Sequence, residues 1–199
     1  MPLVTVVLGA ALAAWVVSVA RMRGMDTGPG TDIGGLAWFL GIWVTMMVAM
    51  MLPAVLPMVL LYARVSQRQG GRIIVFVTSY LLVWTAIGLL AYGAARGIHA
   101  LASDWLAWDA GGAWLTGGAV VAAGVYQLTP LKTLCLRHCR GPLHFVMGGW
   151  RKGDLGALRM GAEHGAWCVG CCAGRILALF SLGGMSLFWM AVVSGAIFA

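Results

Sequence analysis

Residues 35–62 read GLAWFLGIWVTMMVAMMLPAVLPMVLLY and contain no charged side chain. A helix needs about 20 apolar residues to cross the hydrocarbon core of a bilayer, and this stretch is long enough to do so. Pro53 cannot donate a backbone hydrogen bond to the carbonyl of Ala49, so the helix is expected to bend there. The stretch therefore predicts a kinked transmembrane helix.

The rest of the chain has a similar composition. Its 199 residues are 61% hydrophobic and only 10% charged, whereas soluble domains carry about 25% charge. The sequence therefore predicts an all-α, polytopic transmembrane bundle of about six helices, forming a single membrane domain over residues 1–199. The predicted helices cover residues 3–20, 35–62, 73–95, 112–135, 155–181 and 185–199.

The net charge of +7 is spread over short predicted loops, which argues against a nucleic-acid partner and indicates membrane topology instead. Nine bases fall on one side: Arg64, Arg68, Arg72, Lys132, Arg137, Arg140, Arg151, Lys152 and Arg159. The opposite loops hold Arg21, Arg23 and Arg96, with the solvated acids Asp26, Asp32, Asp104 and Asp109. This bias predicts a multi-pass protein of the bacterial inner membrane, with both termini and a long loop over 136–154 in the cytoplasm.

The predicted fifth helix contains the stretch GAEHGAWCVGCCAGR at residues 161–175. His164, Cys168, Cys171 and Cys172 stand at i, i+4, i+7 and i+8, which places them on one helical stripe. A single buried cysteine usually acts as a small hydrophobe. Three thiols and an imidazole on one face favour ligands for a soft metal ion, because an ionisable group at membrane depth is rarely incidental.

The kinked helix carries a second group of sulfur atoms. Met46 and Met50 are one turn apart, and so are Met47 and Met51. Thioethers bind Cu(I) well, although a methionine stripe by itself is more often flexible core packing. The length of each helix places these methionines at a depth similar to that of the cysteines. The two groups are therefore expected to face one another.

A third group lies in YQLTPLKTLCLRHC at residues 126–139. Cys135, His138 and Cys139 stand at i, i+3 and i+4, after Pro130, which breaks or kinks the helix. The predicted topology puts them at the cytoplasmic mouth of the bundle. A structural disulfide is disfavoured in the reducing cytosol, so these residues indicate a metal-binding or redox-active group.

These motifs resemble those of a bacterial family of predicted metal-binding integral membrane proteins of unknown function. The resemblance rests on MMVAMMLP, YQLTPLKTLCLRHCRGP and GAEHGAWCVGCC in that order. It implies a helical membrane bundle with a metal site at the residues that match these motifs. The chain departs from the family at Ala173, where members tend to carry tryptophan.

We predict a membrane protein that binds Cu(I), with zinc as the second choice, for copper handling, transport or delivery. The expected partners are the lipid bilayer, the metal ion, and a metallochaperone or subunits of a membrane complex. A P-loop, a GxSxG elbow and an HExxH motif are absent from the sequence, so an enzyme is the less favoured interpretation. Two alternatives stay open: a membrane thiol–disulfide oxidoreductase, and a structural or assembly subunit.

Overall fold

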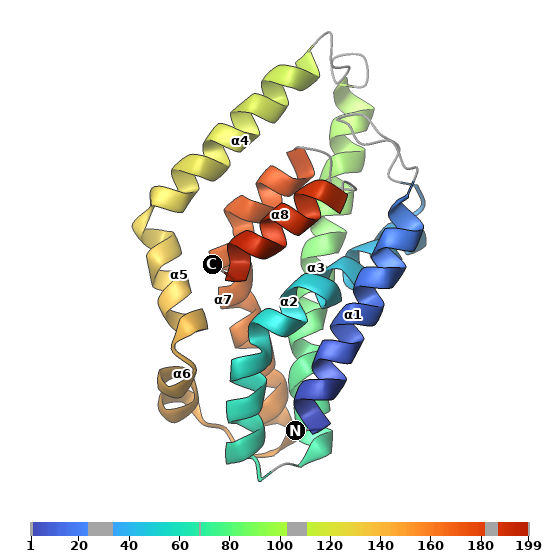
Figure 1. The fold of residues 1–199 in the computed structure, drawn as a ribbon. Coiled ribbons are helices and arrows are strands. Elements are labelled where there is room, and N and C mark those ends of the chain that lie inside the picture. The colour runs from blue at the N-terminus through green and yellow to red at the C-terminus, as the bar shows by residue number, and fades with distance from the viewer. Residues whose placement is uncertain (1, 24–33, 68, 103–110, 182–186, 199) are drawn as a thin grey trace.

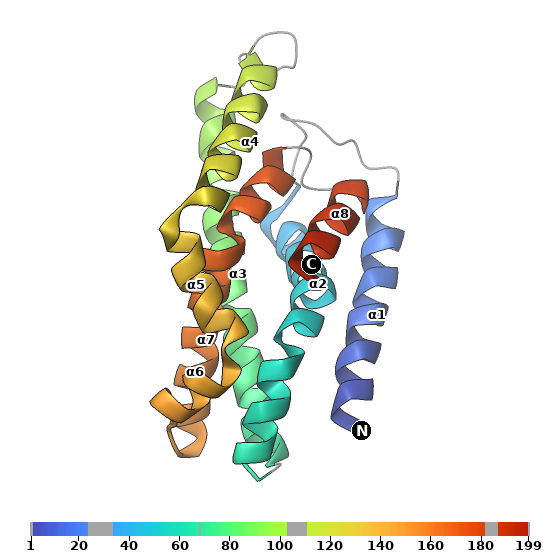
Figure 2. The same cartoon turned by 60° about the vertical axis from the view of Figure 1, so that its left-hand side comes forward.

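The computed structural model describes residues 2–23, 34–67, 69–102, 111–181 and 187–198. These ranges are almost entirely helical and contain no strand, which confirms the all-α prediction. The helices pack into one elongated bundle (Figures 1 and 2). They are α1 (Pro2–Met22), α2 (Leu36–Val65), α3 (Gly70–Ala102), α4 (Ala113–Leu128), α5 (Pro130–Arg140), α6 (Pro142–Gly149), α7 (Gly153–Ser181) and α8 (Leu187–Phe198).

Three of these helices, α1, α2 and α3, are long and apolar enough to cross a membrane. A fourth crossing is available if α4 and α5 are counted as one bent span. The last two predicted helices are present as α7 and α8, but α8 has only 12 residues. Whether they cross a membrane stays a prediction. The four acidic loop residues Asp26, Asp32, Asp104 and Asp109 and the basic Arg68 lie outside the described residues.

Helix α2 lies at the centre of the bundle and bends along its length (Figure 1). It packs against α1 and α3, and large side chains fix its position on α3 at two levels. At one level, the indole N–H of Trp43 donates to the carbonyl of Trp84 at 2.7 Å. At the other, the rings of Tyr62 and Phe76 stack at 4.8 Å. The methionines of α2 lie between these two α2–α3 contacts.

The chain breaks between α4 and α5, as Pro130 predicts. Thr129 has an extended backbone, and Pro130 follows as the first residue of α5, where a missing N–H costs no helical hydrogen bond. The two helices are bent by 67° relative to each other. The Tyr126 hydroxyl next to the break donates to the carbonyl of Gly170 on α7. The break thus turns α5 so that it lies against α7.

Glycines allow α7 to approach its neighbours closely on two sides. A Cβ atom on Gly161 would collide with the backbone carbonyl of Phe76 on α3, and one on Gly165 would lie 3.3 Å from the carbonyl of Tyr80. One on Gly174 would lie 3.1 Å from a carbonyl of α4. Small residues four positions apart are a common basis for tight helix contacts in membranes. Here they hold α7 between α3 and the α4–α5 pair.

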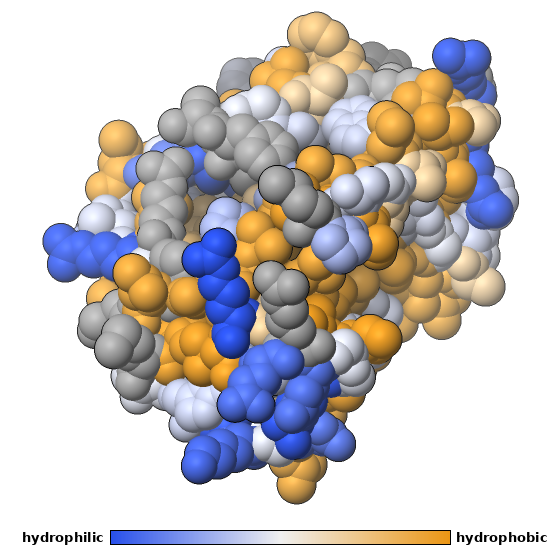
Figure 3. All heavy atoms as spheres, turned by 60° about the horizontal axis from the view of Figure 1, so that its bottom comes forward, coloured by the Kyte–Doolittle hydropathy of each residue, from blue (hydrophilic) through white to orange (hydrophobic). Residues whose placement is uncertain are grey.

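The prediction of a long loop over residues 136–154 is wrong. The expected loop over 136–154 contains the end of α5 and all of α6. Pro142 begins α6, and Val146 of α6 is buried in the core, so burial of apolar surface favours the helix. Hydrophilic side chains gather at the end of the bundle where α2 meets α3 and α6 meets α7, which we call the basic end (Figure 3).

Three ion pairs join α3, α7 and the turn before α7 at this end. Arg72 pairs with Asp154 at 3.4 Å, while Arg151 and Arg159 both pair with Glu163, at 2.9 and 3.1 Å. They use both acidic residues in the described part of the chain. Helix α1 begins at this same end (Figure 2). Which side of a membrane this end faces stays a prediction.

Candidate metal centre

The five cysteines gather where α5 lies against α7. Cys168, Cys171 and Cys172 are at i, i+3 and i+4 on α7, so they share a face, and all three are buried. Cys135 and Cys139, one turn apart on α5, face them from the other side. All five are free thiols. The structure therefore differs from the expectation of two separate groups, because the α4–α5 break brings the α5 thiols to the α7 stripe.

The sulfur atoms of Cys139, Cys168 and Cys171 form the core of this cluster. All three lie within 4.8 Å of one another, and those of Cys139 and Cys171 are 3.5 Å apart. A thiolate sulfur lies about 2.3 Å from a bound metal such as zinc, so sulfurs that share a trigonal ion are roughly 4 Å apart. The donor set thus fits a soft ion with three sulfur ligands. We call these three residues the thiol trio.

Two further cysteines border the thiol trio. The Cys172 sulfur lies 3.6 Å from the Cys171 sulfur and is almost fully buried. Cys135 is also buried and reaches α7 at Gly170, where an added Cβ would lie only 2.7 Å from the Cys135 sulfur. Gly170 is therefore required for this approach. The sequence prediction missed it, although its i, i+4 spacing with Gly174 is a signal for close packing.

A hydroxyl group contacts the thiol trio from α3. The Tyr80 oxygen lies 3.2 Å from the Cys168 sulfur, and Tyr80 is fully buried. A hydroxyl donor stabilises a thiolate more than a thiol, because the charged acceptor makes the stronger hydrogen bond. Tyr80 is thus suited to orient a metal-bound sulfur. The sequence prediction missed it as well, because tyrosine in an apolar helix carries no signal for this role.

His164 lies one turn before Cys168 but is not part of the thiol trio. It is 3% exposed and surrounded by the rings of Phe76, Tyr80 and Phe145. Its Nδ1 atom is buried without a hydrogen-bond partner in the described structure. A buried polar atom in this state costs about 1–3 kcal/mol. Such a group calls for a functional explanation, and its role as a metal ligand stays a prediction.

His138 lies outside the thiol trio. Its ring stacks on Trp167 at 4.1 Å, and its Nδ1 atom lies 3.0 Å from the carbonyl oxygen of Leu134. Trp167 is the residue before Cys168, so the stacked pair adds another contact between α5 and α7. The structure thus gives His138 a packing role beside the cluster, and its predicted role as a ligand stays a prediction.

The methionines of α2 are enclosed in the same core. Met46, Met47, Met50 and Met51 are each at most 2% exposed. They lie between the two α2–α3 contacts, and Tyr80 lies between the same contacts on α3. Because Tyr80 touches Cys168, the methionines and the thiols occupy a similar level of the bundle. A direct approach of the two groups stays a prediction.

Arg175 lies one turn beyond Cys171 on α7 and is half-buried. Both described carboxylates, Asp154 and Glu163, are paired with other arginines at the basic end of the bundle. Within the described ranges, Arg175 therefore has no carboxylate partner. Its positive charge lies close enough to Cys171 to interact with a thiolate there.

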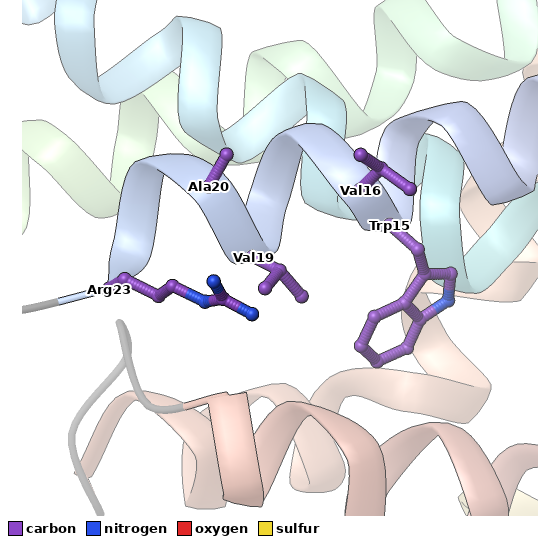
Figure 4. Close-up of a pocket in the computed structure, with 5 residues that line it drawn as sticks. All are labelled: Trp15, Val16, Val19, Ala20 and Arg23. Carbon is purple, nitrogen blue, oxygen red and sulfur yellow. The ribbon is translucent and has the colours of Figure 1, made fainter.

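Two of the cavities that described residues line lie outside the thiol cluster. One, of about 330 Å³, runs along α1 and is lined by Trp15, Val16, Val19, Ala20 and Arg23 (Figure 4). The other, of about 380 Å³, lies between α2, α3 and α7, with Val169 and Ala173 on its α7 wall. Thiols, imidazoles and carboxylates are absent from both linings. Among the described residues, Cys139, Cys168 and Cys171 form the group that could hold a metal ion, so the thiol cluster is the candidate centre.

Comparison with known proteins supports a role in copper chemistry. Searches of curated proteins and of solved structures give no match for this chain. A family model described as "PpoB2: Copper chaperone" matches residues 40–199, which include most of α2, all of α3 to α8 and all five cysteines. The match supports the predicted role in copper handling, whereas the assignment to a family of predicted metal-binding integral membrane proteins stays a prediction. The chain therefore belongs to the PpoB2 copper chaperone family.

Proposed function

We propose that this protein is an integral membrane copper chaperone that holds Cu(I) on the thiol trio and passes it on by ligand exchange. The observation that carries the proposal is the convergence of three sulfur atoms within 4.8 Å, from two helices. Thiolates select Cu(I) over hard cations. Membership of a copper chaperone family gives independent support.

The membrane setting is supported by the outer surface. Many large apolar side chains on α1, α3 and α4 face outward, including Leu90 at 70% and Trp114 at 82% exposure. Such a surface is rare on a soluble monomer, and a bilayer would cover it. The basic end, with its arginines, then lies in the cytoplasm by the positive-inside rule.

The difference in exposure among the thiol trio suggests a direction for exchange. Cys139 is half-buried, whereas Cys168 and Cys171 are buried. A thiolate or thioether of a partner protein would bond to copper as the copper–sulfur bond of Cys139 breaks, and the freed Cys139 thiolate takes up a proton. Further ligands of the partner then replace Cys168 and Cys171 in the same way, and each of these thiolates is protonated as it is released. Cys139 thus acts as the exchange ligand.

The other predicted ligands are assigned to loading and release. Met46, Met47, Met50 and Met51 provide neutral thioethers at the level of the thiol trio, and these bind Cu(I) more weakly than thiolates. His164 provides a buried imidazole nitrogen one turn away. Donors of this kind keep copper coordinated as it approaches the thiolates, because an ion without ligands is costly in a medium of low dielectric constant.

The test is copper uptake by the purified full chain in detergent. Under reducing, anaerobic conditions, we expect elemental analysis to find bound copper and X-ray absorption to find sulfur neighbours. The triple variant Cys139→Ser, Cys168→Ser, Cys171→Ser should lose that copper. Ala173→Ser adds a hydroxyl at an exposed site of α7 and serves as the control. Equal copper uptake by the triple variant and the control would refute the proposal.

A second function is favoured by one distance. The sulfurs of Cys139 and Cys171 lie 3.5 Å apart, so a disulfide between α5 and α7 needs little movement. This geometry supports a thiol–disulfide oxidoreductase. Differential alkylation and mass spectrometry distinguish the two functions. A disulfide that forms and opens as the ratio of reduced to oxidised thiol in the buffer is changed supports the redox role. Five free thiols under all conditions would exclude the redox role.

A further inference from the structure

The sulfur atom of Cys171 has a central place in the thiol cluster. It lies 3.5 Å from the Cys139 sulfur and 3.6 Å from the Cys172 sulfur, and it belongs to the thiol trio with Cys168. Both distances are close to the roughly 4 Å expected for two sulfurs that bind the same ion. Cys171 is therefore positioned to share its sulfur between two metal ions.

A single Cu(I) ion leaves part of the cluster unused. Three thiolates complete the coordination of one ion, and they are Cys139, Cys168 and Cys171. Cys172 and Cys135 then remain as buried thiols at the edge of a site made of sulfur. Cys135 is accommodated only because residue 170 is a glycine, so the local packing is arranged around its sulfur. Other small apolar side chains could fill this part of the core, so packing alone does not require five thiols here.

We propose that the cluster takes two Cu(I) ions that share the Cys171 thiolate. This inference rests on the proposed copper function. The first ion is held by the thiol trio. The second is held by Cys171 and Cys172, with Cys135 beside them. Bridging thiolates are ordinary ligands of Cu(I), because a thiolate sulfur has more than one lone pair to donate.

Charge balance permits the second ion. One Cu(I) on three thiolates leaves two net negative charges in the core. When a second Cu(I) binds, the Cys172 thiol loses its proton, so one positive and one negative charge are added together. The net charge of the cluster stays the same. In a buried site this matters, because each uncompensated charge carries a large desolvation cost.

The stoichiometry of copper binding tests this inference. The reduced full chain in detergent is titrated with Cu(I) against a chromogenic Cu(I) chelator, and copper per chain is measured by elemental analysis. We expect two ions per chain and a short copper–copper scattering path in X-ray absorption. Cys172→Ser should reduce the count to one and remove that path. Ala173→Ser should keep both ions and the path.

The outcomes separate this inference from the proposed function. Uptake of no copper would refute both. Saturation of the wild-type chain at one ion would overturn only the two-ion cluster, as would two ions without a copper–copper path. The variant Met46→Leu, Met50→Leu tests whether the second ion is bound on α2, and loss of one ion from this variant would overturn the two-ion cluster. If Cys172→Ser fails to fold, Cys172→Ala replaces it, while the wild-type count and scattering path still decide.

Discussion

Sulfur atoms are buried in two regions of this molecule, on α2 and between α5 and α7, but their arrangement differs. Met46, Met47, Met50 and Met51 form two adjacent pairs, one turn apart, on the single helix α2. The cysteines come from two helices and converge, with the Cys139 and Cys171 sulfurs 3.5 Å apart across the interface. Ligands from one helix lie on only one side of an ion, whereas ligands from two facing helices can surround it.

The two regions also differ in charge. A thioether stays neutral, so copper on methionines carries its positive charge into the core. Thiolates compensate that charge, and the Tyr80 hydroxyl and Arg175 lie nearby. The comparison indicates that the α5–α7 interface is suited to hold copper, and that the α2 stripe is suited to move it. The predictions below test this difference.

The largest expected effect on Cu(I) affinity comes from removing one sulfur of the thiol trio. Removing one methionine sulfur of α2 is the comparison. Cys171→Ser removes the central ligand, so Cu(I) affinity should fall by about 100-fold or more, as even outer-shell changes cost 10- to 100-fold. Met50→Leu conserves volume, so the affinity of the thiol cluster should stay within about threefold. Competition with a chromogenic Cu(I) chelator measures both. Equal losses would show that the two regions form one site.

Gly170→Ala tests whether the α5–α7 convergence depends on close packing. The new methyl group would meet the Cys135 sulfur at 2.7 Å. We expect a loss of about 1–3 kcal/mol of stability from overpacking, together with weaker copper binding. Gly124→Ala on α4 meets no atom within 4 Å and is the matched control. Thermal unfolding in detergent compares the two variants, and an unchanged Gly170→Ala protein would contradict the tight interface.

Tyr80→Phe removes the hydroxyl that contacts Cys168 but leaves the ring in place. Cu(I) affinity should fall about tenfold, which is typical for loss of a group that orients a ligand. Tyr92→Phe is the control, because its hydroxyl donates to Gly34 at 3.2 Å, far along α3 from the thiols. A chelator competition assay measures both, and an equal effect of the two changes would remove Tyr80 from the site.

Much of this architecture could be predicted from the sequence. The run over 35–62 is apolar on every side, so α2 needed no tertiary information. The break at Pro130 follows from the missing N–H of proline. The stripe of Cys168, Cys171 and Cys172 follows from helical spacing alone. These features depend on local geometry, which the order of residues determines.

The convergence of α5 on α7 could not be predicted in this way. It depends on the 67° bend after α4 and on the space at Gly170, and both are tertiary properties. A straight helix would have carried Cys139 away from Cys171 toward the end of the bundle. Helix α6 was missed for a similar reason, because Val146 stabilises it only when the folded bundle buries that side chain.

Arg175 gives the smallest expected effect and the sharpest test of charge. Arg175→Gln removes a positive charge one turn from Cys171, and Cu(I) affinity should fall about threefold, the scale of a half-exposed charge pair. Arg175→Lys should restore it, while Arg96→Gln, at an exposed site of α3, should have no effect. Chelator competition measures all three.

The same variants should respond differently to Cd(II). Cd(II) on three thiolates carries one net negative charge, where Cu(I) carries two, so loss of Arg175 should weaken Cd(II) binding less. A purely structural defect would weaken both metals equally. Copper on methionines would be positive, and removal of Arg175 would strengthen its binding. The sign of the change thus reports which of the two sulfur regions holds the ion.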